Sequence, residues 1–170
     1  MNKNSLLKLA LESIKAKLEQ TDINITAYEH FNQKEGVFVT LKKRGQLRGC
    51  IGTIVTQEPL YKTVHKMAVA AAFNDYRFQH VRLDELEDIE LSLSIVSIPK
   101  PIVQIDEIKL GVHGVIFKYD QAQSVFLPEV PVEQGWTLIE YLQQLSIKAQ
   151  KEPNDWKKAE LLIFSTEKIS

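Results

Sequence analysis

Hydrophobic residues recur every three or four positions in three parts of the chain, with polar residues between them. This spacing predicts amphipathic helices, because positions three and four apart lie on one face of a helix. The first such segment covers residues 5–20, and the second follows Pro59, which suits the first turn of a helix. Thr137 and Glu140 have the spacing of a capping box and open the third. The sequence therefore predicts three helices.

Other segments alternate apolar and polar residues or are rich in β-branched and aromatic residues, which indicates strands. GVFVTLK at residues 36–42 leads through an Arg44-Gly45 turn into LRGCIG at 47–52, which reads as a hairpin. ELSLSIVSI at 90–98 has the period-two pattern of a half-buried strand. Further strands are predicted at residues 115–119, 124–127 and 160–166.

Strands that return by hairpins, interspersed with three helices, predict an α+β fold built mainly on antiparallel sheet. The chain contains no linker-like stretch, low-complexity segment or internal repeat. Residues 1–170 are therefore predicted to form a single domain, which at this length buries roughly 70% of the surface of the unfolded chain.

The composition is that of an ordinary globular protein, with 44% hydrophobic residues, 25% charged residues and a formal net charge of −1. A near-neutral balance argues against a nucleic-acid-binding surface. No apolar run approaches the 18 or so residues that a membrane span needs. A single cysteine forms no internal disulfide, and the first residues lack the pattern of a secretory leader, so we expect a cytoplasmic protein without membrane association.

The one cysteine, Cys50, stands between two glycines and two residues after an arginine. In an extended strand Arg48 and Cys50 share a face, while Gly49 and Gly52 leave room for a ligand or another stretch of the chain. A nearby cation favours the reactive thiolate, so Cys50 is a candidate nucleophile or redox thiol. The alternative is a packed thiol, because free cysteine is among the most buried residue types.

Several segments together resemble a known family. LRGCIG, the helix end AAAFNDYRF, ELSLSIVS, GVHGVIF and LPEVPVEQGW occur in the order found in the AMMECR-type domain, also called AmmeMemoRadiSam system protein A. The resemblance covers about residues 36–156. It implies an intracellular α+β protein whose larger and smaller lobes enclose a cleft near the cysteine motif. It also implies that the genes of prokaryotic members often accompany those for a Memo-like protein and a radical S-adenosylmethionine protein, which are therefore the candidate partners. The family's molecular activity is not established.

Residues that match the family's motifs supply the candidate binding site. A guanidinium pairs well with a carboxylate or phosphate, so Arg48 or Arg77 is expected to hold a small anionic ligand. An ion pair between Arg77 and Asp75 is the structural alternative. The predicted binding residues are Arg48, Gly49, Gly52, Asp75 and Arg77.

Candidate catalytic partners of Cys50 are fewer. His113 is a weak candidate base, with His80 as an alternative, because a cysteine nucleophile needs an imidazole within hydrogen-bond reach. Glu129, with Glu133 nearby, is a weak candidate for acid and base work. The sequence lacks CxxC and HExxH spacings, so no metal or cofactor is predicted. Two functions stay open, namely an enzyme or enzyme-system component and a non-catalytic binding module.

Overall fold

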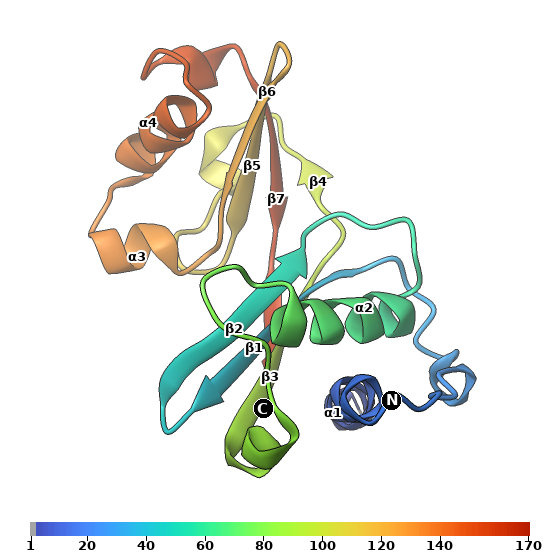
Figure 1. Cartoon of the computed structure of the whole chain (residues 1–170). Coiled ribbons are helices and arrows are strands. Elements are labelled where there is room, and N and C mark those ends of the chain that lie inside the picture. The colour runs from blue at the N-terminus through green and yellow to red at the C-terminus, as the bar shows by residue number, and fades with distance from the viewer. Residues whose placement is uncertain (1–2) are drawn as a thin grey trace. The chain divides into compact units, whose positions relative to one another are not determined.

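The computed structural model describes residues 3–170, which divide into two compact units (Figure 1). The first unit comprises the chain up to Ile98 together with residues 167–170, and the second comprises Pro99–Thr166. The last four residues therefore return to the unit in which the chain began. That residues 1–170 act as a single domain stays a prediction.

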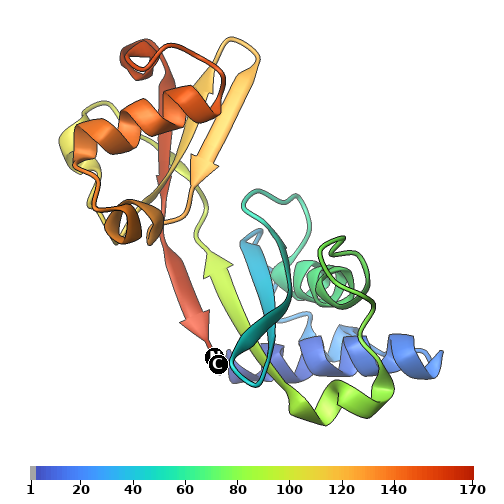
Figure 2. The same cartoon turned by 60° about the vertical axis from the view of Figure 1, so that its left-hand side comes forward.

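The first unit combines a four-stranded sheet with two long helices. Its sheet has the strand order β2-β1-β3-β8, and β1 runs antiparallel to both β2 and β3. The C-terminal strand lies beside β3 in Figure 2. The elements are α1 (Asn4–Glu19), the 3-10 helix η1 (Thr26–Tyr28), β1 (Gly36–Lys43), β2 (Gln46–Thr53), α2 (Leu60–Phe73), the 3-10 helix η2 (Leu83–Asp88), β3 (Ile89–Val96) and β8 (Thr166–Ile169).

Helices α1 and α2 cover one face of this sheet. Val37, Val39 and Leu41 alternate along β1 and are completely buried in the same apolar cluster as residues from both helices. Phe38 and Thr40 point to the other face and are only half-buried. This is the alternation that the sequence predicts, and it places every second residue of β1 outside the helix-covered core.

The β1–β2 hairpin turns at two residues with positive φ, Arg44 at 51° and Gly45 at 75°. Two such residues match the twist of the flanking strands, which is why this turn is short. Leu41 pairs with Gly49 but the next residue of β1 pairs with Leu47, so Arg48 is the extra residue of a β-bulge. The simple alternation expected to place Arg48 and Cys50 on one face does not hold across this step.

The second unit has its own sheet, of order β4-β7-β5-β6, and its own core. Phe117 of β5 and Tyr141, Leu142 and Leu145 of α4 are completely buried together. The elements are β4 (Lys100–Pro101), η3 (Ile105–Glu107), β5 (Gly114–Tyr119), β6 (Ala122–Phe126), α3 (Val130–Gln134), α4 (Leu138–Lys148), η4 (Asp155–Lys157) and β7 (Glu160–Phe164).

The predicted class, α+β with mainly antiparallel sheet, is confirmed. Two details of the prediction are wrong. Residues 3–170 contain four α-helices rather than three, because the five-residue helix α3 is too short to produce a hydrophobic period. The strand expected at residues 160–166 is two strands, β7 and β8, which belong to different sheets.

Candidate functional site

Cys50 lies on β2, at the edge of the first sheet, and its side chain is half-buried. The residue faces Thr40 of β1, and Thr40 in turn faces Ser92 of β3. The Cys50 sulfur lies 3.3 Å from Thr40 Oγ1. The thiol therefore borders a row of small hydroxyl side chains instead of the apolar core of the helix-covered face.

Two side chains from the segment after α2 bind the backbone of Cys50. The Asp75 carboxylate accepts a hydrogen bond from the Cys50 amide (2.9 Å, N to Oδ2), and Arg77 Nη2 donates to the Cys50 carbonyl oxygen (3.3 Å). Arg77 also donates to both carboxylate oxygens of Asp75, at 2.9 Å from Nε and 2.7 Å from Nη2. The two side chains thus form one hydrogen-bonded unit, which we call the Asp75–Arg77 clamp.

The clamp takes the place of a missing neighbour strand. An edge strand leaves outward-facing N–H and C=O groups without partners, and these attract unwanted strand pairing. At Cys50 the carboxylate of Asp75 replaces the acceptor and the guanidinium of Arg77 replaces the donor of such a neighbour. This use of the pair explains why the Asp75 side chain is only 2% exposed although it carries a charge.

Both partners of the clamp are held in their charged forms. The hydrogen bonds from Arg77 are the main reason that the pKa of Asp75 lies well below its usual range, although burial opposes them. The bonds to Asp75 likewise raise the pKa of Arg77, burial opposes them, and the charge of Asp75 adds in smaller part. The clamp therefore stays charged from mildly acidic to alkaline pH.

One end of the Arg77 guanidinium has no partner in the part of the chain that the structure describes. Its Nη1 makes no hydrogen bond to any residue within 3–170, and the side chain is 45% exposed. The guanidinium carbon lies 5.4 Å from the centre of the Phe78 ring, and the neighbouring Tyr76 is 96% exposed. A fixed cation with free donors thus lies over the half-buried ring of Phe78, and Tyr76, the residue before Arg77, exposes its side chain.

Arg48 is bound to the protein by four hydrogen bonds. Its Nη1 donates to the carbonyl of Gln79 (2.8 Å) and its Nη2 to that of His80 (3.2 Å). The Glu85 carboxylate accepts from Nη2 (2.6 Å) and from Nε (3.4 Å). The Arg48 side chain is 17% exposed. It ties the bulge of β2 to the loop after α2 and to η2, while its predicted ligand-binding role stays a prediction.

Glu85 is the site residue that the sequence reasoning missed. It accepts from Lys43 Nζ (2.8 Å) as well as from Arg48, and its side chain is 12% exposed. Burial raises its pKa, but the hydrogen bonds from Arg48 and Lys43 outweigh burial and lower the pKa to about 2. The acidic run LDELED at residues 83–88 indicates candidate partners for a cation, but nothing in that run distinguishes Glu85 from its acidic neighbours.

The two glycines of the motif face protein atoms. A Cβ at Gly49 would lie 2.2 Å from the carbonyl oxygen of Ala71, so α2 approaches the strand closely at this point. A Cβ at Gly52 would lie 2.4 Å from the Phe38 ring on the opposite face. The space that the sequence left open for a ligand or another stretch of the chain is filled by the chain itself. The predicted ligand-binding role of Gly49 and Gly52 stays a prediction.

The other predicted catalytic residues, His113 and Glu129, belong to the second unit. His113 Nδ1 accepts from the Lys109 amide (3.2 Å), which leaves the proton of the neutral ring on Nε2. Glu129 precedes α3 as its N-cap residue. Their catalytic roles stay predictions.

In the first unit, the His80 ring packs edge to face on Phe73, with centroids 5.8 Å apart, and makes no hydrogen bond to the Cys50 sulfur. Among residues 3–170, no three His, Cys, Asp or Glu side chains gather closely enough to hold a metal ion. No helix in the same part of the chain is long and apolar enough to cross a membrane.

Comparison with known proteins agrees with the resemblance seen in the sequence. The AMMECR1 family model matches residues 7–169. Protein NEQ441 of Nanoarchaeum equitans is 32% identical over 171 residues, which cover 94% of this chain and 95% of that protein. Protein MJ0810 of Methanocaldococcus jannaschii is 38% identical over 136 residues, covering 75% of this chain and 68% of that protein.

The crystal structure of an uncharacterised protein, PH0010 from Pyrococcus horikoshii, superposes with a TM-score of 0.78 at 31% identity. The match covers 96% of this chain and 88% of that one. Sequence and fold thus agree over nearly the whole chain, and the protein belongs to the AMMECR1 family.

Proposed function

We propose that this protein is a component of an enzyme system and binds a small anionic group at the outer edge of β2. Arg77 holds the anion through the two N–H donors of Nη1, and Cys50 supplies a thiol next to it. A carboxylate or a phosphate group fits these donors, because each presents a charged oxygen that accepts a strong hydrogen bond from a guanidinium N–H.

The observation that supports this proposal most strongly is that two nitrogens of the Arg77 guanidinium bind the protein, whereas the third does not bind any of residues 3–170. Nε and Nη2 bind Asp75 and the Cys50 carbonyl, which fixes the plane of the group. Nη1 is left for a ligand. An arginine held in this way loses little further side-chain entropy when an anion binds. Arg48 fits the role less well, because its guanidinium already has four protein acceptors.

Cys50 is the group in this site that can supply chemistry. It is half-buried and its sulfur has a hydroxyl neighbour in Thr40. An anion bound on Arg77 lies beside the same residue, since Arg77 Nη2 contacts the Cys50 carbonyl. The thiol is therefore the candidate nucleophile or redox group for whatever is bound there.

A non-catalytic binding module is the second candidate function. Tyr76 supports it, because an almost fully exposed aromatic side chain beside an arginine is typical of the residues that dominate protein interfaces. The partner would be a Memo-like or radical S-adenosylmethionine protein, as the family resemblance implies. If capture of that partner is lost with Arg77→Gln but kept with Cys50→Ser, binding without chemistry is favoured.

The direct test uses inorganic phosphate as the probe in calorimetric titrations of the whole chain. Arg77→Gln should weaken binding by about tenfold, as expected for one charged hydrogen-bonding group. Arg82→Gln is the matched control, because Arg82 is also exposed and also pairs with an aspartate two residues away, Asp84. Equal losses in the two variants would contradict a specific site at Arg77.

The role of the thiol is tested by alkylation with iodoacetamide. The chain has a single cysteine, so Cys50 is the one thiol that the reagent can modify. Saturating phosphate should slow modification of Cys50 in the wild-type chain and have no effect in Arg77→Gln. A Cys50 that reacts only after unfolding would contradict its role as the reactive group but would leave anion binding standing.

A further inference from the structure

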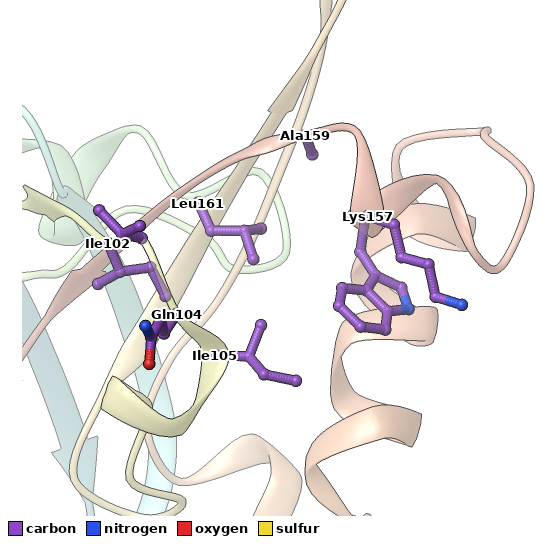
Figure 3. Close-up of a pocket in the computed structure, with 8 residues that line it drawn as sticks. Ile102, Gln104, Ile105, Lys157, Ala159 and Leu161 are labelled. Carbon is purple, nitrogen blue, oxygen red and sulfur yellow. The ribbon is translucent and has the colours of Figure 1, made fainter.

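The second unit contains a separate pocket of about 280 Å³ that the proposed site does not use. Ile102, Gln104 and Ile105 line one side of it, and Lys157 marks the other side (Figure 3). Ala159 and Leu161 of the segment that enters β7 complete the lining together with Val103 and Trp156. The volume lies just below the range of about 300–1,000 Å³ in which drug-sized ligands bind, so it suits a smaller molecule.

The first wall of this pocket is fixed by hydrogen bonds. The Ile102 amide donates to the Leu161 carbonyl (3.0 Å), which extends the pairing of β4 with β7. The Glu107 carboxylate accepts from the amides of Val103 and Gln104, both at 3.0 Å. This wall is therefore preformed, which lowers the entropic cost of binding.

The opposite wall, Trp156, is held mainly by packing. Its backbone amide donates to Ser146 Oγ (3.0 Å), but the indole Nε1–H is buried and has no acceptor among residues 3–170. Buried indole N–H groups usually find a partner. The indole can consequently shift to fit a ligand without breaking a hydrogen bond.

The charge at the rim is positive. The Lys157 ammonium lies 5.6 Å from the centre of the Trp156 ring and is directed away from the pocket floor (Figure 3). Within residues 3–170 no carboxylate pairs with it, whereas the next residue, Lys158, is paired with Asp155 at 3.1 Å. Apolar side chains from both walls, together with an unpaired cation at the rim, complement a molecule that has one apolar group and one negative charge.

We propose that this pocket binds a small monocarboxylate whose apolar ring or chain lies between Ile105 and Trp156. The carboxylate stays at the rim and pairs with Lys157. This site lies wholly within the second unit and is independent of the anion site on Arg77.

The test is a two-dimensional NMR titration of the whole chain with 3-phenylpropionate, and with 3-phenyl-1-propanol as its uncharged analogue. Trp136→Phe assigns the indole N–H signal of Trp156, since the chain has two tryptophans. The acid should shift that signal and the methyl signals of Ile102 and Ile105 saturably, with a Kd on the order of 1 mM for a ligand of this size. The alcohol should bind at least about threefold more weakly, because it lacks the charge.

Lys157→Gln should remove the difference between the acid and the alcohol, and Lys158→Gln should preserve it. Ala159→Leu should fill the pocket and abolish binding of both probes. The proposal is overturned if the acid gives no saturable shifts at these signals, if the two probes bind equally to the wild type, or if the two lysine variants behave alike. The lysine comparison stands even if Ala159→Leu does not fold.

Discussion

The Asp75 carboxylate accepts a hydrogen bond from the backbone amide of Cys50, at 2.9 Å, so a residue just after α2 completes the edge of β2. Arg77 joins the same arrangement from the carbonyl side of Cys50. The cysteine motif and the motif after α2 are therefore one structural unit, although 25 residues separate Cys50 from Asp75. The main role of Asp75 is to hold this edge, and that role also fixes Arg77.

Replacing Asp75 by alanine should destabilise the protein. The change leaves the Cys50 amide without its acceptor, and an unsatisfied buried donor costs about 1–3 kcal/mol. Urea unfolding monitored by circular dichroism measures the loss of free energy. Asp84→Ala is the control, since that carboxylate is exposed and, among residues 3–170, pairs only with Arg82. If both variants unfold at the same urea concentration as the wild type, the clamp does not stabilise the edge.

Acid should weaken the fold through Asp75 and Glu85. The pKa of each is lower in the folded protein than in the unfolded chain, where carboxyl groups titrate near pH 4. Such groups stabilise the fold fully above the unfolded pKa, and that stabilisation is lost as the pH falls through the folded pKa. For Glu85 the loss should extend from about pH 5 down to its folded pKa of about 2.

Unfolding free energies at a series of pH values from 7 to about 2.5 measure this dependence. Glu85→Gln should have a shallower decline between pH 5 and 3 than the wild type, because the variant has one fewer carboxylate to protonate. Identical slopes for Glu85→Gln and the wild type would show that Glu85 is not the group responsible.

Arg48→Ala should loosen the segment from Gln79 to η2. The substitution removes four hydrogen bonds and leaves Glu85 with Lys43 as its remaining cationic partner. We expect a loss of about 2 kcal/mol or more, because one partner of a largely buried ion pair is deleted. Compared with the wild type, the rate of amide hydrogen exchange should increase in η2 and stay unchanged in α4. If the exchange rates in η2 are the same in the variant and the wild type, Arg48 does not hold η2 in place.

A methyl group at Gly49 should disturb the contact between β2 and α2. Gly49→Ala places a Cβ against the Ala71 carbonyl oxygen, and forcing extra atoms into a packed interior costs about 1–3 kcal/mol. Thermal unfolding measures this effect. Gly45→Asn is the matched control, because Gly45 has no atom within 4 Å of a new Cβ and asparagine tolerates its positive φ. A control that melts lower than Gly49→Ala would refute this explanation of the motif.

Local pattern predicted most of the elements but not their assignment to two units. The alternation along β1 and the capping box before α4 are local signals, and both were confirmed, with Glu140 accepting from the Thr137 amide at 2.7 Å. Strand β8 has four residues and pairs with β3, far away in sequence, so its place depends on contacts that no short window records.

The sequence predicted which residues form the candidate site, but it predicted less of how they are arranged. The family motifs named Arg48, Cys50, Asp75 and Arg77, and the ion pair between Asp75 and Arg77 was the structural alternative foreseen. A bulge was one of the explanations considered for the two glycines, but its position at Arg48 was not predicted, because it depends on the register between two strands. The acceptors of Arg48 include two backbone carbonyls, whose positions depend on the folded loop rather than on residue type.

The anion site at Arg77 is tested most directly by the NMR response of the arginine side chains to inorganic phosphate. We expect saturable shifts of the Arg77 guanidinium signals and of the Cys50 amide in the wild type, no shift of the Cys50 amide in Arg77→Gln, and little change of the Arg82 signals in either chain. Equal shifts of Arg77 and Arg82, or shifts that grow without saturation, would contradict a specific anion site beside Cys50.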